Sequence, residues 1–293
     1  MEKFKEKARV LVEALPYIRR FYGKRVVIKY GGHAMVDDDL KEEFALDVIL
    51  MKYVGMNPII VHGGGPQIGD MLKRVGKGTQ FVSGLRVTDE ETMEIVEMVL
   101  VGKINKELVS LINHLGGKAV GLSGKDGGLI RAKKLRVMKS SLETGQPEII
   151  DIGLVGEVEM IDPHIITVLE QGGYIPVIAP VGVGERRESY NINADLAAGD
   201  IAAALKAEKF LQMTDVPGIL DGKNQLIPSL NVAGIKDLIS SGIINEGMLP
   251  KVQGCLKALE GGVSKTHIID GRTRHSLLLE IFTDEGIGTE IVP

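Results

Sequence analysis

The chain has 293 residues, of which 44% are hydrophobic and 25% charged, and this composition predicts a globular α/β protein long enough for two lobes rather than a disordered chain. Its net charge of −4 and its lack of tryptophan argue against nucleic-acid binding, which needs a basic excess with interleaved aromatic residues. A single cysteine, no signal-peptide pattern and no run of ~18 apolar residues together predict a cytoplasmic protein without disulfides or a membrane span.

The first quarter of the chain predicts helices that alternate with buried strands. Residues 3–22 carry apolar side chains at helical spacing, and Gly23 ends this helix. Pro16 predicts a kink near residues 12–16, because proline removes a backbone hydrogen bond and clashes with the preceding turn. The next predicted elements are a strand over 26–30, a helix capped by Asp37 or Asp38 and stopped by Gly55, a strand ending at His62, and a helix over 66–75.

The middle of the chain predicts a long helix and then a different kind of structure. Thr88 and Glu91 form a capping box that opens a helix to about residue 115. Residues 116–160 alternate short β-prone pieces with turns, which predicts hairpins set over an α/β core. The predicted turns lie around 124–128, at Glu143-Thr144-Gly145 and over 153–156.

The C-terminal part returns to alternation of strands and helices. The segment Gly182-Val183-Gly184 is a candidate boundary between a lobe of residues 25–183 and a lobe of residues 184–293, preceded by the kinked helix of residues 1–24. Such alternation implies a mainly parallel sheet covered on both faces. The predicted elements are helices from 162 to 171 and from about 193, strands over 174–179, 210–216 and 266–270, a hairpin through 221–224, two further helices, and a strand near the C-terminus.

A glycine-rich junction follows the strand over residues 59–61. His62 leads into Gly63-Gly64-Gly65 and then a helix start, so backbone N–H groups can approach a ligand and the helix N-terminus favours an anion. A tight turn would need only one or two of these glycines. The chain lacks a P-loop and a protein-kinase motif set, and the dinucleotide fingerprint fails at Ile68, where its third glycine would fall. His33 and His62 lack the partners of a metal site, so we predict no protein metal ligand.

Six blocks in order along the chain resemble the N-acetylglutamate kinases of the amino acid kinase family. The resemblance runs from about residue 8 to residue 291, and the combination of the third and fourth blocks is its most specific part. It implies a three-layer α/β/α sandwich with a mainly parallel central sheet and two lobes. The blocks are Lys29-Tyr30-Gly31-Gly32, Val61-His62-Gly63-Gly64-Gly65-Pro66, Gly84-Leu85-Arg86-Val87-Thr88, Asn191-Ile192-Asn193-Ala194-Asp195, Thr214-Asp215-Val216-Pro217-Gly218-Ile219-Leu220 and Gly247-Met248-Leu249-Pro250-Lys251.

The resemblance implies ATP-dependent phosphorylation of the side-chain carboxylate of N-acetyl-L-glutamate to N-acetyl-L-glutamyl 5-phosphate, in arginine biosynthesis. A carboxylate with a pKa near 4.3 is already ionised at pH 7, so no general base is required, and fixed positive charge should dominate catalysis. By resemblance, Lys29 and Lys251 stabilise the transferring phosphoryl group and Asp195 organises the two lysines. The alternatives are solvated lysines and a carboxylate that only complements a helix dipole.

The same resemblance assigns the two substrates to different residues. Arg86 offers a bidentate grip on the α-carboxylate, with a surface salt bridge as the alternative, and Asn191 can bind the acetamido or carboxylate group. Gly64 and Gly65 supply backbone contacts to the amino acid. Mg²⁺ accompanies ATP, held mostly by phosphates and water, and no tightly bound cofactor is expected. The nucleotide residues are Gly31, Gly32, Asp215, Val216, Pro217, Gly218, Ile219, Leu220, Ile243, Ile244 and Asn245.

The N-terminal helix and the tail over 275–289 resemble the arginine-inhibited branch of the family. In that branch N-terminal helices interlace dimers into a hexamer, a trimer of dimers, and arginine binds between this helix and the C-terminal lobe. The alternative is a helix that packs within one protomer, and Glu290 departs from the small or apolar residue more usual there. Some relatives also bind a nitrogen-regulatory protein. The implied arginine-site residues are Tyr22, Glu280, Gly286 and Gly288.

Two other functions remain open at this point. One is a kinase of another N-blocked acidic amino acid, which the blocks over 84–88 and 191–195 disfavour. The other is a non-catalytic amino-acid sensor on the same fold, which would not need to retain Lys29, Asp195 and Lys251 together.

Overall fold

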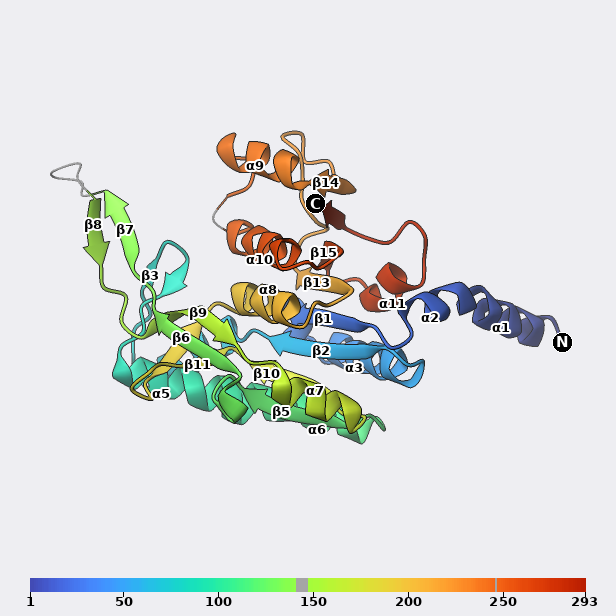
Figure 1. The fold of residues 1–293 in the computed structure, drawn as a ribbon, viewed down its shortest axis with the longest axis horizontal. Coiled ribbons are helices and arrows are strands. Elements are labelled where there is room, and N and C mark those ends of the chain that lie inside the picture. The colour runs from blue at the N-terminus through green and yellow to red at the C-terminus, as the bar shows by residue number, and fades with distance from the viewer. Residues whose placement is uncertain (141–146, 246) are drawn as a thin grey trace.

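The computed structural model describes residues 1–140, 147–245 and 247–293, and its centre is one eight-stranded sheet with helices on both sides (Figure 1). Neighbouring strands run parallel throughout this sheet except for one antiparallel pair, β15 with β16. The predicted mainly parallel α/β fold is therefore confirmed. The strand order is β14 (Ser229–Asn231), β16 (Thr289–Val292), β15 (Lys265–Asp270), β13 (Lys209–Thr214), β1 (Arg25–Tyr30), β2 (Asn57–His62), β10 (Ile175–Ala179) and β5 (Ala119–Ser123).

Two hydrophobic cores, one on each face of the sheet, make this a three-layer sandwich. Side chains alternate between the faces of a strand, so Val26 and Ile28 of β1 belong to one core and Val27 to the other. The first face is covered by α3 (Asp38–Tyr53), α4 (Gly65–Arg74), α5 (Glu90–Glu97), α6 (Asn105–His114) and α11 (Ser276–Ile281). The opposite face is covered by α7 (His164–Gln171), α8 (Ala194–Ala204), α9 (Val232–Ser240) and α10 (Leu249–Glu260).

The N-terminal segment forms two helices, α1 (Glu2–Glu13) and α2 (Leu15–Phe21), which meet at Ala14. The kink predicted near residues 12–16 thus corresponds to an interruption of the helix at Ala14. Pro16 stands in the first turn of α2, where its missing N–H leaves no helical hydrogen bond unmade. In Figure 1, α1 projects away from the body of the molecule, whereas Phe21 at the end of α2 is buried in the core.

The long helix predicted after residue 88 exists, but its start and its middle differ from the prediction. Asp89, and not Thr88, caps it: the Asp89 carboxylate accepts from the Thr92 N–H at 2.8 Å, while the Thr88 hydroxyl donates to the Arg86 carbonyl. An N-cap side chain must directly precede the first helical residue, and here that residue is Glu90. A π-helical segment, Met98–Ile104, then joins α5 to α6.

The region predicted as hairpins contains one strand of the main sheet. β5 pairs in parallel with β10, so the hairpin prediction is wrong for residues 119–123. The two-stranded hairpin of β7 (Val137–Ser140) and β8 (Pro147–Ile150) extends from the body in Figure 1, and the predicted turn Glu143-Thr144-Gly145 lies outside the described residues. A small closed barrel consists of β6 (Ile130–Lys134), β9 (Val155–Ile161), β11 (Val181–Val183) and β12 (Ser189–Ile192).

The segment predicted as a boundary between lobes, residues 182–184, begins inside a strand of the barrel. Gly182 lies inside β11, where an added Cβ would meet the Ile192 side chain at 2.6 Å, so tight packing against the barrel requires glycine there. Within the described part of the chain, no helix combines the length and the apolar character needed to cross a membrane.

Candidate active site

A cavity of about 280 Å³ lies where β1 and β2 end, at the carboxyl edge of the parallel sheet. In open α/β sheets this edge is the usual place for a ligand, because loops from several strands converge there. The cavity gathers six of the seven residues predicted for catalysis and amino-acid binding, and the seventh, Lys251, touches one of them from α10. The six are Lys29, Gly64, Gly65, Arg86, Asn191 and Asp195.

Asp195 stands between the two predicted catalytic lysines. Its Oδ1 lies 2.8 Å from Lys29 Nζ and its Oδ2 lies 3.4 Å from Lys251 Nζ. Burial alone would raise the pKa of Asp195, but the two lysines and a hydrogen bond from Gln212 lower it to about 2. The aspartate is therefore an anion that holds two cations at the cavity wall.

Three elements, β1, α8 and β13, hold Lys29 and Asp195 in this arrangement. Lys29 points to the same face of the sheet as Val27, and this is the face on which α8 packs. Asn193 caps α8 by accepting from the N–H of Asp195 at 2.8 Å, which sets the carboxylate in the first helical turn. Gln212 of β13 donates its amide to Asp195 Oδ1 at 2.6 Å. The sequence analysis did not identify Gln212, because a glutamine inside a strand carries no motif.

Close packing of α8 against α10 brings Lys251 to Asp195. An added Cβ at Gly254 of α10 would lie 2.3 Å from the Asp195 carbonyl oxygen, and one at Gly199 of α8 would lie 2.2 Å from the Gly254 carbonyl oxygen. Only glycines allow two helix backbones to approach so closely. The sequence analysis also missed this pair, although two glycines inside predicted helices are a recognisable signal of close packing.

One glycine in each of the two loops at the cavity has a side chain packed close against it. A Cβ at Gly31 would lie 2.4 Å from Lys29 Nζ, and a Cβ at Gly64 would lie 2.4 Å from the Ile104 side chain of the π-helical segment. His62 before the loop is fully buried, and burial lowers its pKa to about 4, so its ring is neutral at pH 7. Its Nδ1 donates to the Gly63 carbonyl at 2.8 Å and holds the loop in place.

Arg86 of β4 (Leu85–Arg86) also lines the cavity. Its Nη1 donates to Thr79 at 3.0 Å, its Nη2 donates to the Gly65 carbonyl at 2.9 Å, and its guanidinium lies 4.9 Å from the centre of the Phe81 ring. These contacts hold the planar cation against the glycine loop. Asn191 of β12 donates its amide to Thr88 at 3.3 Å. Both side chains can bind a carboxylate or amide that enters the cavity.

The residues predicted for the nucleotide divide into two groups. Gly31 and Gly32 line the cavity, and the Asp215 carboxylate after β13 accepts from the His33 N–H in the turn that follows them. The segments 215–220 and 243–245 do not line the cavity. Asp215, Pro217, Ile243 and Asn245 are exposed, Val216 and Leu220 are half-buried, and Gly218, Ile219 and Ile244 are buried.

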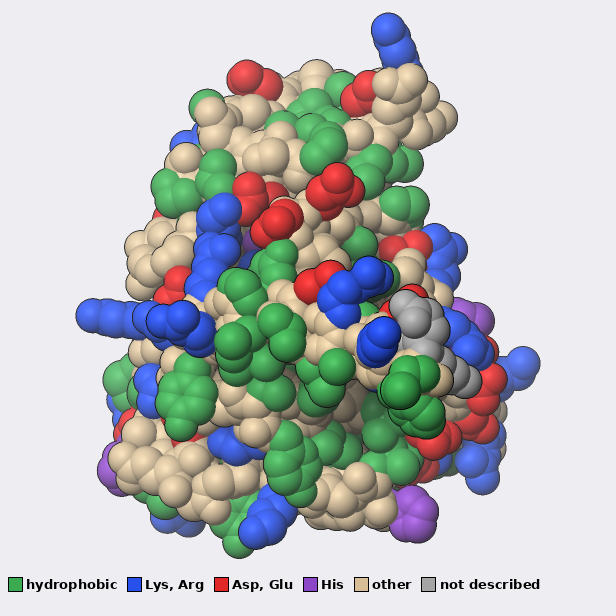
Figure 2. Space-filling model, turned by 90° about the vertical axis from the view of Figure 1, so that its right-hand side faces the viewer, with side chains coloured by type: hydrophobic (Ala, Val, Ile, Leu, Met, Phe, Trp, Pro, Cys, Tyr) green, Lys and Arg blue, Asp and Glu red, His purple; other side chains and the backbone are tan. Residues whose placement is uncertain are grey.

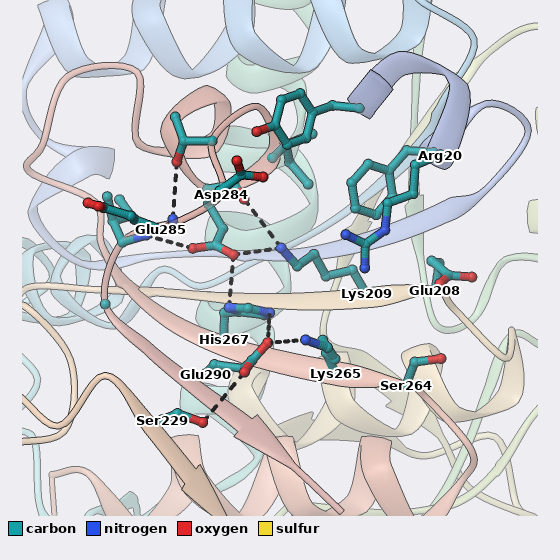
Figure 3. Close-up of a pocket in the computed structure, with 18 of the residues that line it drawn as sticks. Arg20, Glu208, Lys209, Ser229, Ser264, Lys265, His267, Asp284, Glu285 and Glu290 are labelled. Carbon is teal, nitrogen blue, oxygen red and sulfur yellow. Dashed lines mark hydrogen bonds and ion pairs between the residues drawn. The ribbon is translucent and has the colours of Figure 1, made fainter. Parts of the chain in front are cut away.

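A second cavity of about 360 Å³ opens between α2, the sheet and the loop after α11 (Figure 3). Of the residues that the resemblance implied for an arginine site, Glu280, Gly286 and Gly288 line this cavity and Tyr22 does not. The side chains that α2 contributes are those of Tyr17, Arg20 and Phe21. Tyr17 and Phe21 are four residues apart and therefore share a face of α2. The Tyr22 ring instead packs on Gly55, where a Cβ added to Gly55 would lie 2.4 Å from the ring.

Glu280 is the electrostatic centre of this second cavity. Its Oε1 accepts from Lys209 Nζ at 2.6 Å and from His267 Nδ1 at 2.8 Å, and its Oε2 accepts from the Ile287 N–H at 2.9 Å. Burial alone would raise the pKa of Glu280, but His267 and Lys209 lower it to about 2. Figure 3 also shows Glu290 beside His267, and its Oε1 lies 2.6 Å from Lys265 Nζ.

Comparisons with known proteins identify the family of this chain. The family described as "Amino acid kinase family" matches residues 24–270. An acetylglutamate kinase of Syntrophus aciditrophicus is 62% identical over 292 residues, which covers 100% of this chain and 99% of that protein. An acetylglutamate kinase of Syntrophobacter fumaroxidans is 64% identical over 287 residues, which covers 98% of this chain and 96% of that protein.

A solved structure shows the same fold at much lower sequence similarity. The N-acetylglutamate synthase of Neisseria gonorrhoeae superposes with a TM-score of 0.83 at 23% identity, over 98% of this chain and 63% of that longer protein. The full-length relatives, the family match and the three-layer sheet agree with one another. The chain therefore belongs to the amino acid kinase family and, within it, to the acetylglutamate kinases.

Proposed function

We propose that this protein is a cytoplasmic enzyme that phosphorylates the side-chain carboxylate of N-acetyl-L-glutamate with ATP, in arginine biosynthesis. The lobe of residues 25–183 would bind mainly the amino acid and the lobe of residues 184–293 mainly the nucleotide. Asn191 and the Gly31-Gly32 turn would each contact the other substrate. The observation that carries the proposal is the placement of Lys29 and Lys251 on either side of Asp195, at a cavity that also contains Arg86 and a glycine loop. The full-length relatives named for this activity support the choice of substrate.

In the proposed reaction the substrate is an anion that must approach a polyanion. Arg86 binds the α-carboxylate, Asn191 binds the acetamido group, and the N–H groups of Gly64 and Gly65 hold the substrate at the start of α4. The acceptor carboxylate is ionised at pH 7 and attacks without a general base. Lys29 and Lys251 then exchange their contacts with Asp195 for the phosphoryl oxygens and stabilise the charge that spreads over the transferring group.

The nucleotide would lie between the turn after β1 and the segments 215–220 and 243–245. Gly31 and Gly32 present backbone N–H groups beside Lys29, which suits the terminal phosphates. Mg²⁺ bound to ATP would neutralise part of the triphosphate charge, held by phosphate oxygens and water. In the described residues no three His, Cys, Asp or Glu side chains gather as a metal-binding group, so the donors of this ion would come mainly from the nucleotide.

The second cavity supports feedback inhibition by arginine as a finer proposal. A guanidinium placed there would compete with Lys209 for Glu280 and meet further carboxylates of Asp284, Glu285 and Glu290. Because α2 forms one wall, ligand binding there would change how the N-terminal segment sits against the sheet.

The N-terminal helix α1 supports a hexamer built from three dimers. The side chains of Phe4 and Leu11 of α1 are 72% and 73% exposed. Exposed apolar side chains that lie together on one element mark a surface that a partner can cover. Figure 2 shows the side of the molecule from which α1 projects in Figure 1. Hydrophobic side chains gather across the middle of this side, between charged ones. A second copy of α1 is the proposed partner of this surface.

An assay of ADP production tests the proposal. ADP should form with N-acetyl-L-glutamate and not with glutamate or aspartate, and added arginine should reduce the rate. Turnover of another N-blocked acidic amino acid but not N-acetylglutamate would refute the substrate. No turnover in a single-turnover measurement with ATP would indicate a sensor on the same fold.

A further inference from the structure

Gln212 is a buried polar residue that no part of the proposed mechanism uses. It lies in the middle of β13, in register with Lys29 of β1, and its exposed fraction is 0%. Alternation along β13 places Gln212 on the same face as Phe210, under α8 and α10. The side chain therefore lies in the layer between the sheet and the two helices that carry Asp195 and Lys251.

The amide of Gln212 has one hydrogen bond, and it is to Asp195. Nε2 donates to Asp195 Oδ1 at 2.6 Å, and the same oxygen lies 2.8 Å from Lys29 Nζ. An ionised carboxylate only accepts hydrogen bonds, so the nitrogen and not the oxygen of the amide must face it. The other end, Gln212 Oε1, is buried without a hydrogen-bond partner.

This half-satisfied amide is a poor choice for stability alone. A buried amide oxygen without a partner destabilises the fold, and an apolar side chain of the same length would avoid that cost. Phe210 and Ile268 flank Gln212 on the same face of the sheet, so an apolar side chain would also pack there. A glutamine here is explained by what its nitrogen does for Asp195.

The reaction makes a third donor to Asp195 useful. Lys29 and Lys251 must turn toward the phosphoryl group, and each then weakens its contact with the carboxylate. A buried carboxylate that loses both cations either takes up a proton or rotates. Gln212 is neutral and fixed in a central strand, so it stays in contact with Oδ1 while the lysines move.

We propose that Gln212 is a positioning residue, which holds Asp195 aligned and ionised so that both lysines can exchange between the carboxylate and the phosphoryl group. This inference rests on the proposed role of Asp195 in the kinase reaction. Gln212 does not touch the substrates and acts only through the aspartate.

The first test replaces the donor and keeps the volume. Gln212→Met should lower kcat about tenfold, the effect expected for a lost hydrogen bond to a charged group, and leave KM for ATP and N-acetylglutamate within about twofold. The matched control is Thr266→Val on the adjacent strand β15. Thr266 is also 0% exposed on the same face and has an unpartnered Oγ1, but it does not bond to Asp195. This control should keep the wild-type kcat.

The second test restores a donor that depends on pH. In Gln212→Glu, a protonated carboxyl can donate to Asp195, whereas an ionised one repels it; burial beside an anion should raise the pKa of the new carboxyl. The kcat of each variant is divided by the kcat of wild type at the same pH. Under acidic conditions this ratio should be higher for Gln212→Glu than for Gln212→Met. The ratio for Gln212→Glu should then fall as pH rises. A residue that only fills space would give no such profile.

The outcomes separate this inference from the proposed function. If wild type does not phosphorylate N-acetylglutamate, the function fails before any variant is compared. If wild type is active, the inference is overturned when Gln212→Met keeps kcat within twofold of wild type, or when the loss of activity in Gln212→Met appears in KM. It is also overturned when Thr266→Val loses as much kcat as Gln212→Met, or when kcat of Gln212→Glu is no higher than that of Gln212→Met at any pH. Melting temperatures of all three variants identify any that fails to fold.

Discussion

Asp195 shows how single residues make this site. It is buried in the first turn of α8, and its two oxygens are shared among Lys29, Lys251 and Gln212. An unpaired buried carboxylate would be costly, so the two lysines and the aspartate stabilise each other before any substrate arrives. The resting site therefore keeps its cations in place without exposing them fully to water.

Lys251 gives the most direct prediction at this scale. In Lys251→Ala, kcat should fall roughly 10²–10³-fold while KM changes little, because the lost charge acts mainly in the transition state. Steady-state kinetics with both substrates measure this. Lys257→Ala is the matched control, since Lys257 lies on the same helix but pairs with Asp200 at 2.9 Å. Equal losses in the two variants would contradict the assignment.

Glu280 predicts how stability depends on acid. Its pKa of about 2 in the folded protein lies below the ~4.3 of an unfolded glutamate. Its contribution to the free energy of unfolding is therefore fully present above about pH 4.3 and is lost as pH falls toward 2.

The Glu280→Gln variant should be less stable than wild type at pH 7, and this difference should shrink in thermal melts toward pH 3. Glu285→Gln removes an exposed carboxylate from the same cavity and should match wild type across the range. A constant difference between Glu280→Gln and wild type at all pH values would contradict the prediction.

The pairing of α8 with α10 is the decisive contact at the scale of elements. It forms where Gly199 and Gly254 let the two backbones touch, and it carries Lys251 to Asp195. The same elements supply the core on this face of the sheet through residues such as Ala198 and Val252. Packing and the proposed catalysis therefore depend on the same helix crossing.

Gly254→Ala should separate the two helices. The added Cβ would meet the Asp195 backbone at 2.3 Å, so the helices must shift, at a cost of about 1–3 kcal/mol in stability and with a lower kcat. Thermal melts and kinetics on one sample measure both effects. Gly102→Ala, where an added Cβ meets nothing within 4 Å, is the control and should change neither. A stable variant with full activity would show that the crossing is not needed.

For the whole molecule, the N-terminal segment has two parts that can be removed separately. Deletion of residues 1–14 removes α1 and keeps α2, so the wall of the second cavity stays in place. We expect this variant to be a dimer by mass in solution, because the exposed apolar face of α1 is lost. Deletion of residues 1–22 should also give dimers and, in addition, weaken arginine inhibition. Hexamers after either deletion would refute a linking role for α1.

The roles predicted for Lys29, Asp195 and Lys251 came from the resemblance of six sequence blocks to a known family, and not from periodicity. Lys29 precedes two glycines, Asp195 follows a helix cap, and Lys251 follows Pro250, so each lies where an element starts or ends. Arg86 was found through the block that contains it. Tyr22, which the resemblance implied for an arginine site, does not line the second cavity, because it does not share the face of α2 that Tyr17 and Phe21 share.

The sequence by itself determined the alternation of strands and helices, the mainly parallel sheet and the break in the N-terminal helix, because these follow from local periodicity, glycine and proline. Only the tertiary structure decided that β5 joins the main sheet, that a π-helical segment faces Gly64, and that Gln212 bonds to Asp195. These features depend on contacts between residues far apart in the chain. Local propensity carries no information about such contacts, because they arise from the packing of one whole layer against another.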